Sequence, residues 1–170
     1  MKKILALSVI LLLVCQSCLY FDIEPSIIQK FSNEDLAVVP YQKGQQFNMI
    51  DQNNDTLLWI VNEDTIFNNG YSCNRHININ SPDSIKRIIS MDLWTNKQLE
   101  IFYYNANNKT SCSYRFDFNA CSPRTLVIDN NTFYNVYVSS SDDPSNQIIY
   151  SISQGIIRIQ KDSNYLQLIP

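Results

Sequence analysis

The sequence is poor in several residue types on which common catalytic and binding motifs depend. It has three glycines, Gly44, Gly70 and Gly155, which lie too far apart to form a glycine-rich phosphate loop. It has one histidine, His76, so a Ser-His-Asp arrangement has a single available base, and no Gly-x-Ser-x-Gly segment accompanies it. With so few glycines, most turns must be made by Asn, Asp and Ser, which hydrogen-bond their own backbone and, for Asn and Asp, tolerate left-handed conformations.

Charged residues are also scarce, at 17% of the chain, and basic residues are outnumbered by acidic ones. The formal net charge is −3, and loss of residues 1–17, which hold two lysines and no acidic residue, lowers it to −5. This balance argues against nucleic acid and anionic lipid surfaces as electrostatic partners. A hydrophobic content of 45% with 12% aromatic residues is too apolar for a disordered chain, so the remainder is expected to fold as one domain.

The N-terminus carries the most informative segment. Two lysines precede the apolar run Ile4–Val14, whose eleven residues are typical of a secretory signal. The run is too short for a transmembrane helix, which needs about 20 residues. Together with Ser17 and Cys18 it resembles the lipobox of bacterial lipoproteins, although Cys15 stands where that pattern usually has Leu. The resemblance implies cleavage before Cys18, acylation of Cys18 and attachment to a lipid bilayer, and a plain cleaved signal peptide is the alternative.

The chain therefore divides into a signal peptide (1–17), whose apolar run is expected to be helical, a tether (18–35) and an all-β domain (36–170). Leu19–Phe31 is predicted as a short tether with mixed apolar residues and Pro25, and no helix is expected there or in Ser32–Asp35, which follows it.

From Tyr41 onward, short apolar segments alternate with clusters of Asn, Asp, Ser and Pro. This pattern predicts an antiparallel meander of about 10 to 12 strands, formed as a curled sheet, a barrel or a sandwich. Thr56–Val61 and Thr65–Phe67 are predicted as separate strands.

Two parts of the domain resemble small outer-membrane lipoproteins of the Bacteroidetes. The first is Pro40–Phe47 with the later Asp55-Thr56, and the second is Tyr134–Val138 followed by Ile149–Ser151 and Gly155–Ile159. The resemblance implies an all-β envelope lipoprotein in the outer membrane, on either its periplasmic or its cell-surface face. The resemblance implies no particular activity.

Three cysteines remain in the domain. In an oxidising envelope one disulfide is expected, joining Cys73 to either Cys112 or Cys121. Cys73 falls on the apolar side of its strand, so a buried small hydrophobic residue is the alternative. A zinc site made with His76 is not expected, because residues three apart in a strand point to opposite faces. No metal and no cofactor is predicted.

Acidic pairs such as Glu63-Asp64 and Asp142-Asp143 offer acid/base chemistry for a glycan hydrolase, but both are expected in solvated turns. Three short Asp-Thr or Asp-Ser segments resemble the O-glycosylation motif of Bacteroidetes envelope proteins, with Thr56, Thr65 and Ser84 as acceptors. Ordinary turn-to-strand residues are the alternative.

Aromatic residues such as Tyr103 and Trp94 either line a groove or barrel mouth suited to a lipid, glycan or peptide, or belong to the core. The first hypothesis is a non-enzymatic, membrane-anchored binding or accessory module whose partner is an envelope protein, a glycan or a small ligand. No catalytic residue is predicted. The alternatives are a small envelope glycan hydrolase that uses a carboxylate pair, and a structural or assembly protein whose exposed strand edge pairs with a partner.

Overall fold

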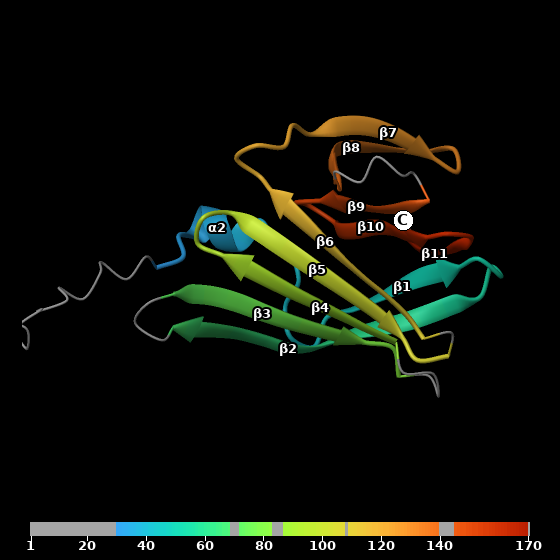
Figure 1. Cartoon of the computed structure of the whole chain (residues 1–170), viewed down its shortest axis with the longest axis horizontal. Helices are drawn as coiled ribbons and strands as arrows, with labels where there is room; N and C mark the ends of the chain where they lie inside the picture. Colours follow the sequence, from blue (N-terminus) through green and yellow to red (C-terminus); the bar gives the residue numbers. More distant parts are fainter. Residues whose placement is uncertain (1–29, 69–71, 83–86, 108, 140–144, 170) are drawn as a thin grey trace, which may run out of the picture.

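The computed structural model describes residues 30–68, 72–82, 87–107, 109–139 and 145–169. The predicted signal peptide, Cys18, Ser84 and Asp142-Asp143 lie outside the described residues. The described part contains the short helix α2 (Asn33–Ala37) and eleven strands (Figure 1). The strands are β1 (Gln46–Asp51), β2 (Thr56–Asn68), β3 (Cys73–Asn80), β4 (Arg87–Trp94), β5 (Gln98–Asn105), β6 (Thr110–Asp117), β7 (Arg124–Ile128), β8 (Asn131–Val138), β9 (Asn146–Ser151), β10 (Gly155–Lys161) and β11 (Asn164–Leu168).

The eleven strands form one antiparallel sheet with the order β6-β5-β4-β3-β2-β1-β11-β10-β9-β8-β7. The first strand pairs with the last, with Met49 of β1 opposite Leu168 of β11. The two halves of the meander are therefore joined in the middle of the sheet, and the free edges are β6 and β7. The sheet curls into a half-barrel, as expected from the accumulated twist of so many strands (Figure 1). The predicted all-β antiparallel meander is confirmed, in the form of a curled sheet.

The main hydrophobic core lies inside the curl. β3 and β4 alternate strictly between buried and partly exposed residues, so one face of each strand is apolar and enclosed. Their inward residues lie in cross-strand rows, for example Ile79 opposite Ile89, which is opposite Tyr103 of β5. A second, smaller cluster around Phe133 and Ile149 lies in the β7–β11 half of the sheet.

The turns follow from the scarcity of glycine. Seven described residues other than glycine have a positive φ: Asn54, Lys97, Lys109, Asp129, Asn130, Asn135 and Asp162. Five of the seven are Asn or Asp, whose short side chains tolerate the left-handed region. The predicted use of Asn and Asp as turn residues is confirmed.

The prediction that Ser32–Asp35 contains no helix is wrong. The Ser32 hydroxyl accepts a bond from the Asp35 N–H at 3.1 Å, and the Asp35 carboxylate accepts one from the Ser32 N–H at 2.9 Å. This capping box, together with Glu34 in the first turn, starts α2 despite its length of five residues. The helix begins inside the segment predicted as a tether.

The separation of Thr56–Val61 from Thr65–Phe67 is also wrong, because both belong to β2. The register of β2 against β3 shifts between Val61 and Glu63, so one extra residue is absorbed as a β-bulge and the strand continues. Glu63 and Asp64 consequently lie in a strand and not in a solvated turn.

Candidate functional site

The two ends of the half-barrel differ in what fills them. One end holds α2 and residues 36–41, which we call the strap and which comprise the last two residues of α2 and the four that follow it. The opposite end, which we call the cavity end, holds the β1–β2, β5–β6 and β10–β11 turns (Figure 1). About six residues of β3 separate Arg75, near the strap end, from Ser81 at the cavity end, a distance of about 20 Å at the rise of an extended strand.

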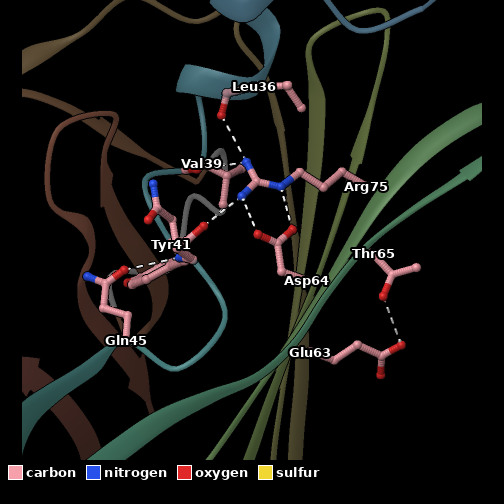
Figure 2. Close-up of polar contacts among 9 residues, drawn as sticks. Leu36, Val39, Tyr41, Gln45, Glu63, Asp64, Thr65 and Arg75 are labelled. Carbon is pink, nitrogen blue, oxygen red and sulfur yellow. Dashed lines mark hydrogen bonds and ion pairs between the residues drawn. The ribbon is translucent and has the colours of Figure 1, made fainter.

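The strap end is closed by the guanidinium of Arg75. Its Nε and Nη2 donate to the two carboxylate oxygens of Asp64 at 2.8 and 2.9 Å. Its remaining N–H groups donate to the strap carbonyls of Leu36, Val39 and Tyr41 at 3.0, 3.0 and 2.6 Å (Figure 2). All five donors of the guanidinium are therefore satisfied by protein acceptors. Arg75 holds the strap against β2 and β3 and has no donor left for a ligand.

Tyr41 completes the closure by filling the interior behind the strap. It is buried against Gly155, where a Cβ would overlap its hydroxyl end, and its hydroxyl accepts a bond from the Ile156 N–H at 2.8 Å. The Tyr150 hydroxyl in turn donates to the Val38 carbonyl at 2.7 Å. Burial raises the pKa of both phenols well above the ordinary value, so both stay neutral. The interior at this end is occupied by the protein's own chain.

The cavity end contains a small polar cavity instead. Its volume is about 20 Å³, which exceeds the roughly 10–15 Å³ that one water needs. Apolar residues of β10 and β11 form part of its wall. Its charged and hydrogen-bonding lining includes Asp51, Arg87, Tyr103, Asn105, Lys161 and Asn164.

The charged residues reach the cavity from the ends of three different strands. Asp51 is the last residue of β1, and its Oδ1 accepts bonds from the N–H groups of Asn53 and Asp55 in the turn that follows. Its other oxygen lies 3.8 Å from Nη2 of Arg87, the first residue of β4. Both side chains are less than a tenth exposed. Lys161 ends β10 and is a third exposed. The site thus gathers two cations and one anion.

Tyr103 contributes a phenol to the same cavity. It belongs to the inward row that contains Ile89, and it is 7% exposed. Burial raises its pKa, outweighing the opposite effects of a hydrogen bond with Asn105 and of the Arg87 charge. The phenol is therefore protonated at neutral pH and able to donate a hydrogen bond into the cavity.

The three domain cysteines are free thiols in the structure. Cys112 lies in the row of Tyr103 and Ile79, whereas Cys73 is six residues from Ile79 along β3, which is about 20 Å. A disulfide requires Cα atoms within about 7 Å, so the pairing of Cys73 with Cys112 does not fit this fold. The pairing of Cys73 with Cys121 is not formed here and stays a prediction. Burial raises the pKa of the Cys112 thiol, which favours the neutral form.

His76 lies on the polar side of β3, as predicted. Its Nδ1 is 2.9 Å from Asp92 Oδ1, which also accepts a bond from Asn74 at 3.3 Å. The Asp92 carboxylate thus orients the imidazole of His76. The sequence did not predict this pair, because the two residues lie on different strands. Thr65 is directly opposite His76, but its hydroxyl donates to Glu63 at 3.3 Å. No hydrogen bond between His76 and a hydroxyl or thiol is present in the described part of the chain.

The predicted glycan acceptors have different settings. Thr56 is exposed at the start of β2, whereas Thr65 is partly exposed within the strand and hydrogen-bonded to Glu63.

Within the described ranges, no three His, Cys, Asp or Glu side chains are grouped so that they could hold a metal ion. Nor does any helix there have the length and apolar character needed to cross a membrane.

Sequence reasoning named Tyr103 but missed Asp51, Arg87 and Lys161. Asp51 directly follows an apolar segment and Arg87 directly precedes one, but Lys161 lies between Gln160 and Asp162, so no local pattern is common to the three residues. Comparisons with known proteins add no further assignment, because no family model, no curated protein and no solved structure matches the chain.

Proposed function

We propose that the protein is a lipid-anchored outer-membrane lipoprotein whose β domain is a non-enzymatic binding module, with the cavity-end site as its ligand pocket. The signal-like N-terminus and Cys18 support the anchor, because two or three acyl chains hold a protein on a bilayer almost permanently. The resemblance to Bacteroidetes envelope lipoproteins supports the outer membrane as its location.

One observation carries the binding function. At the cavity end, charged and hydrogen-bonding groups from the ends of three strands converge on a small, partly enclosed space. Concave sites with a few convergent polar groups and an apolar wall are the usual form of small-ligand pockets. A broad depression of about 760 Å³ beside the strap is less suited, because its charged residues, Arg75 and Asp64, are bonded to each other.

The position of the cavity fits a tethered protein. Residues before α2 join the domain at the strap end, so a chain leading from Cys18 attaches there. Attachment at the strap end leaves the opposite, cavity end accessible to a ligand in the aqueous phase.

A glycan hydrolase is less well supported. Both oxygens of Asp64 are held by Arg75, and Glu63 accepts a bond from Thr65, so the Glu63-Asp64 pair is not poised as an acid and a base. At the cavity, Asp51 is the one carboxylate among the lining residues, and two backbone N–H groups and Arg87 hold it.

The anchor is tested by metabolic labelling with a palmitate analogue. Label on the wild-type chain should be lost in Cys18→Ala and retained in Cys15→Ala. Label that survives Cys18→Ala would contradict the anchor.

The binding function is tested with a panel of small cationic, neutral and anionic compounds on the full chain in detergent. Thermal shift and amide chemical shifts should identify compounds whose binding is weakened by Lys161→Met and not by Lys43→Met. Lys43 is an exposed lysine two residues after the strap that does not line the cavity, and it serves as the matched control. A panel in which no compound distinguishes the two variants contradicts a pocket at the cavity end.

A second candidate function is strand addition at β6. In an antiparallel pair, every second residue of a strand bonds to the neighbouring strand. The N–H of Phe118 donates to the Lys97 carbonyl, so the even-numbered residues of β6 bond to β5. By that alternation, the backbone N–H and C=O groups of Ser111, Ser113 and Arg115 point away from β5. No described strand pairs with them, so this edge is open to a partner strand. Ser113→Pro removes one of these backbone N–H groups, whereas Ser113→Thr keeps it. Chemical cross-linking of β6 to an envelope partner should therefore be abolished in Ser113→Pro and retained in Ser113→Thr.

A further inference from the structure

We infer that a groove between β7 and β10, on the face of the sheet opposite to the main core, binds a small organic carboxylate with an apolar body. The groove, which we call the β7 groove, is lined by residues 124 and 126–129 together with residues of β8, β9 and β10. Arg124 and Arg158 hold the carboxylate, and the apolar part of the lining packs against the body of the ligand. The β7 groove shares no lining residue with the cavity end, so the two sites are tested independently.

The register of the strands places this groove. Ile159 of β10 is opposite Ile148 of β9, and both belong to the main core. Their neighbours Arg158 and Ile149 are also opposite each other and point to the other face, because side chains alternate along a strand. Val138 of β8 extends this row. The hairpin of β7 and β8 lies beside β9 and β10, and β7 supplies the opposite wall of the groove (Figure 1).

The groove has the size and the apolar surface that a small organic ligand needs. Its volume is about 440 Å³, within the range of roughly 300–1,000 Å³ that is usual for ligand pockets. Apolar side chains from three strands form one part of its lining: Leu126, Val127, Ile128, Val138 and Ile149. Leu126 and Val138 are partly exposed, so they have surface left for contact with a ligand.

The charge of the lining favours an anion. Arg124 and Arg158 contribute two positive charges and Asp129 one negative charge, in a chain whose net charge is −3. Asp129 Oδ2 lies 4.0 Å from Arg158 Nη1 and its side chain is 62% exposed, and such a pair is weak in water. Arg124 is exposed and has no ion-pair partner among the described residues. The groove is therefore a positive site that repels cations.

The Arg158 guanidinium is held in place but is not saturated with acceptors. Its Nη1 donates to Gln167 at 3.2 Å, and its central carbon lies 4.5 Å from the centroid of the Tyr165 ring. These two contacts fix its orientation. Its Nε is enclosed, yet has no hydrogen-bond acceptor in the described part of the chain. An enclosed donor without an acceptor is unfavourable, and a ligand oxygen supplies what it lacks.

Arg75 shows how a carboxylate uses this edge of a guanidinium. There Nε and Nη2 donate to the two oxygens of Asp64, at 2.8 and 2.9 Å. At Arg158 the same two nitrogens have no acceptor within the described residues. Two parallel bonds of this kind match the planar carboxylate. The side-chain amides of Gln147 and Gln160, which are opposite each other and line the same groove, are further donors.

The test titrates the full chain in detergent with four compounds that share a phenyl body and differ in the attached group. These are benzoate, phenyl phosphate, benzamide and benzylammonium, each added at constant ionic strength. Benzoate should give saturable amide shifts at Leu126, Val138 and Ile149. Benzamide and benzylammonium should bind at least about tenfold more weakly, because they lack the charge-assisted bonds.

Variants of the two arginines locate the carboxylate. Arg158→Lys keeps the charge but loses the planar two-point donor, so benzoate binding should weaken about tenfold. Arg124→Met should weaken it about threefold, and this exposed position can be replaced without disturbing the core. Arg115→Met is the matched control, because Arg115 is 64% exposed on β6 and does not line the groove. It should bind benzoate as the wild type does.

Several results would overturn the inference. Tighter binding of phenyl phosphate than of benzoate would replace the carboxylate by a phosphate. Equal binding of benzoate and benzamide would mean that the groove recognises only an apolar body. Absence of saturable shifts in the groove, or benzoate binding that both Arg124→Met and Arg158→Lys leave unchanged, would remove the site. Benzoate shifts confined to Tyr103 and Asn164 would assign the ligand to the cavity end and leave the proposed pocket standing.

Discussion

The two ends of the half-barrel each bury one arginine, and the two arginines are used differently. The side chains of Arg75 and Arg87 are 8% and 9% exposed. Arg75 donates to both carboxylate oxygens of Asp64, and its other N–H groups donate to backbone carbonyls of the strap. Arg87 faces a cavity, and its ion pair with Asp51 has a nitrogen–oxygen distance of 3.8 Å, longer than a hydrogen bond.

This difference teaches that burial of a charge does not by itself indicate function. A guanidinium whose five donors all have protein acceptors stabilises the chain segments that supply them. The Arg87 guanidinium instead lies in the wall of a small cavity, together with Lys161. We expect perturbations at the strap end to change stability, and perturbations at the cavity end to change binding.

Alkaline pH should have the largest effect, because it acts on the phenols packed behind the strap. Burial raises the folded-state pKa of Tyr41 and Tyr150 above the ordinary value of 10.0. Their contribution to stability is therefore fully present below pH 10 and is lost as pH rises toward the folded-state values. Circular dichroism should show cooperative unfolding above about pH 10, accompanied by a rise in tyrosinate absorbance. In Tyr41→Phe the fall in unfolding free energy with pH should be shallower. Ionisation of these phenols near pH 10 in a folded chain would contradict the closed strap end.

Arg75→Met should have the next largest effect. It leaves the Asp64 carboxylate and the three strap carbonyls without their donor, and breaking a buried pair on one side costs about 3–5 kcal/mol. Denaturant unfolding measures this loss. Arg115→Met is the control: Arg115 is 64% exposed, so a change within about 0.5 kcal/mol is expected. Equal effects of the two variants would show that the strap is not held by Arg75.

Gly155→Ala should destabilise by about 2–4 kcal/mol, from left-handed strain and from overlap with Tyr41. Gly44→Ala separates the two causes, because Gly44 has a similar φ of +85° but no atom within 4 Å of its Cβ position. Its loss should be about 1–2 kcal/mol, from strain alone. Thermal unfolding of both variants measures the difference, and equal losses would mean that Tyr41 does not lie against Gly155.

Lys161→Met should have the smallest effect on stability and the largest on ligand binding. A partly exposed lysine with a 4.0 Å ion pair contributes about 0–1 kcal/mol, so the melting temperature should shift little. A large loss of stability in this variant would show that Lys161 stabilises the fold. The cavity end would then not differ from the strap end in this respect.

Part of this architecture could be predicted from local pattern. Alternation in Cys73–Asn80 placed His76 on the polar side and Cys73 on the apolar side, and the structure confirms both. Local pattern failed at Glu63-Asp64, which looks like a turn because both residues are acidic. The bulge between Val61 and Glu63 lets β2 continue through these two acidic residues, and Asp64 pairs with the buried side chain of Arg75 in β3. It failed also at α2, where one capping box and tertiary contacts with Arg75 override a weak helical signal.

The sequence by itself determined the all-β class, the meander and the kind of turn, because alternation and turn chemistry are properties of neighbouring residues. Only the tertiary structure decided where the sheet joins and what fills each end. Pairing of β1 with β11 joins the half of the sheet that carries Lys161 to the half that carries Asp51 and Arg87, and the three residues line one cavity although Lys161 is 110 residues from Asp51 in the chain. Charges so far apart in sequence form one site only through the register and curl of the whole sheet, and no local pattern encodes that geometry.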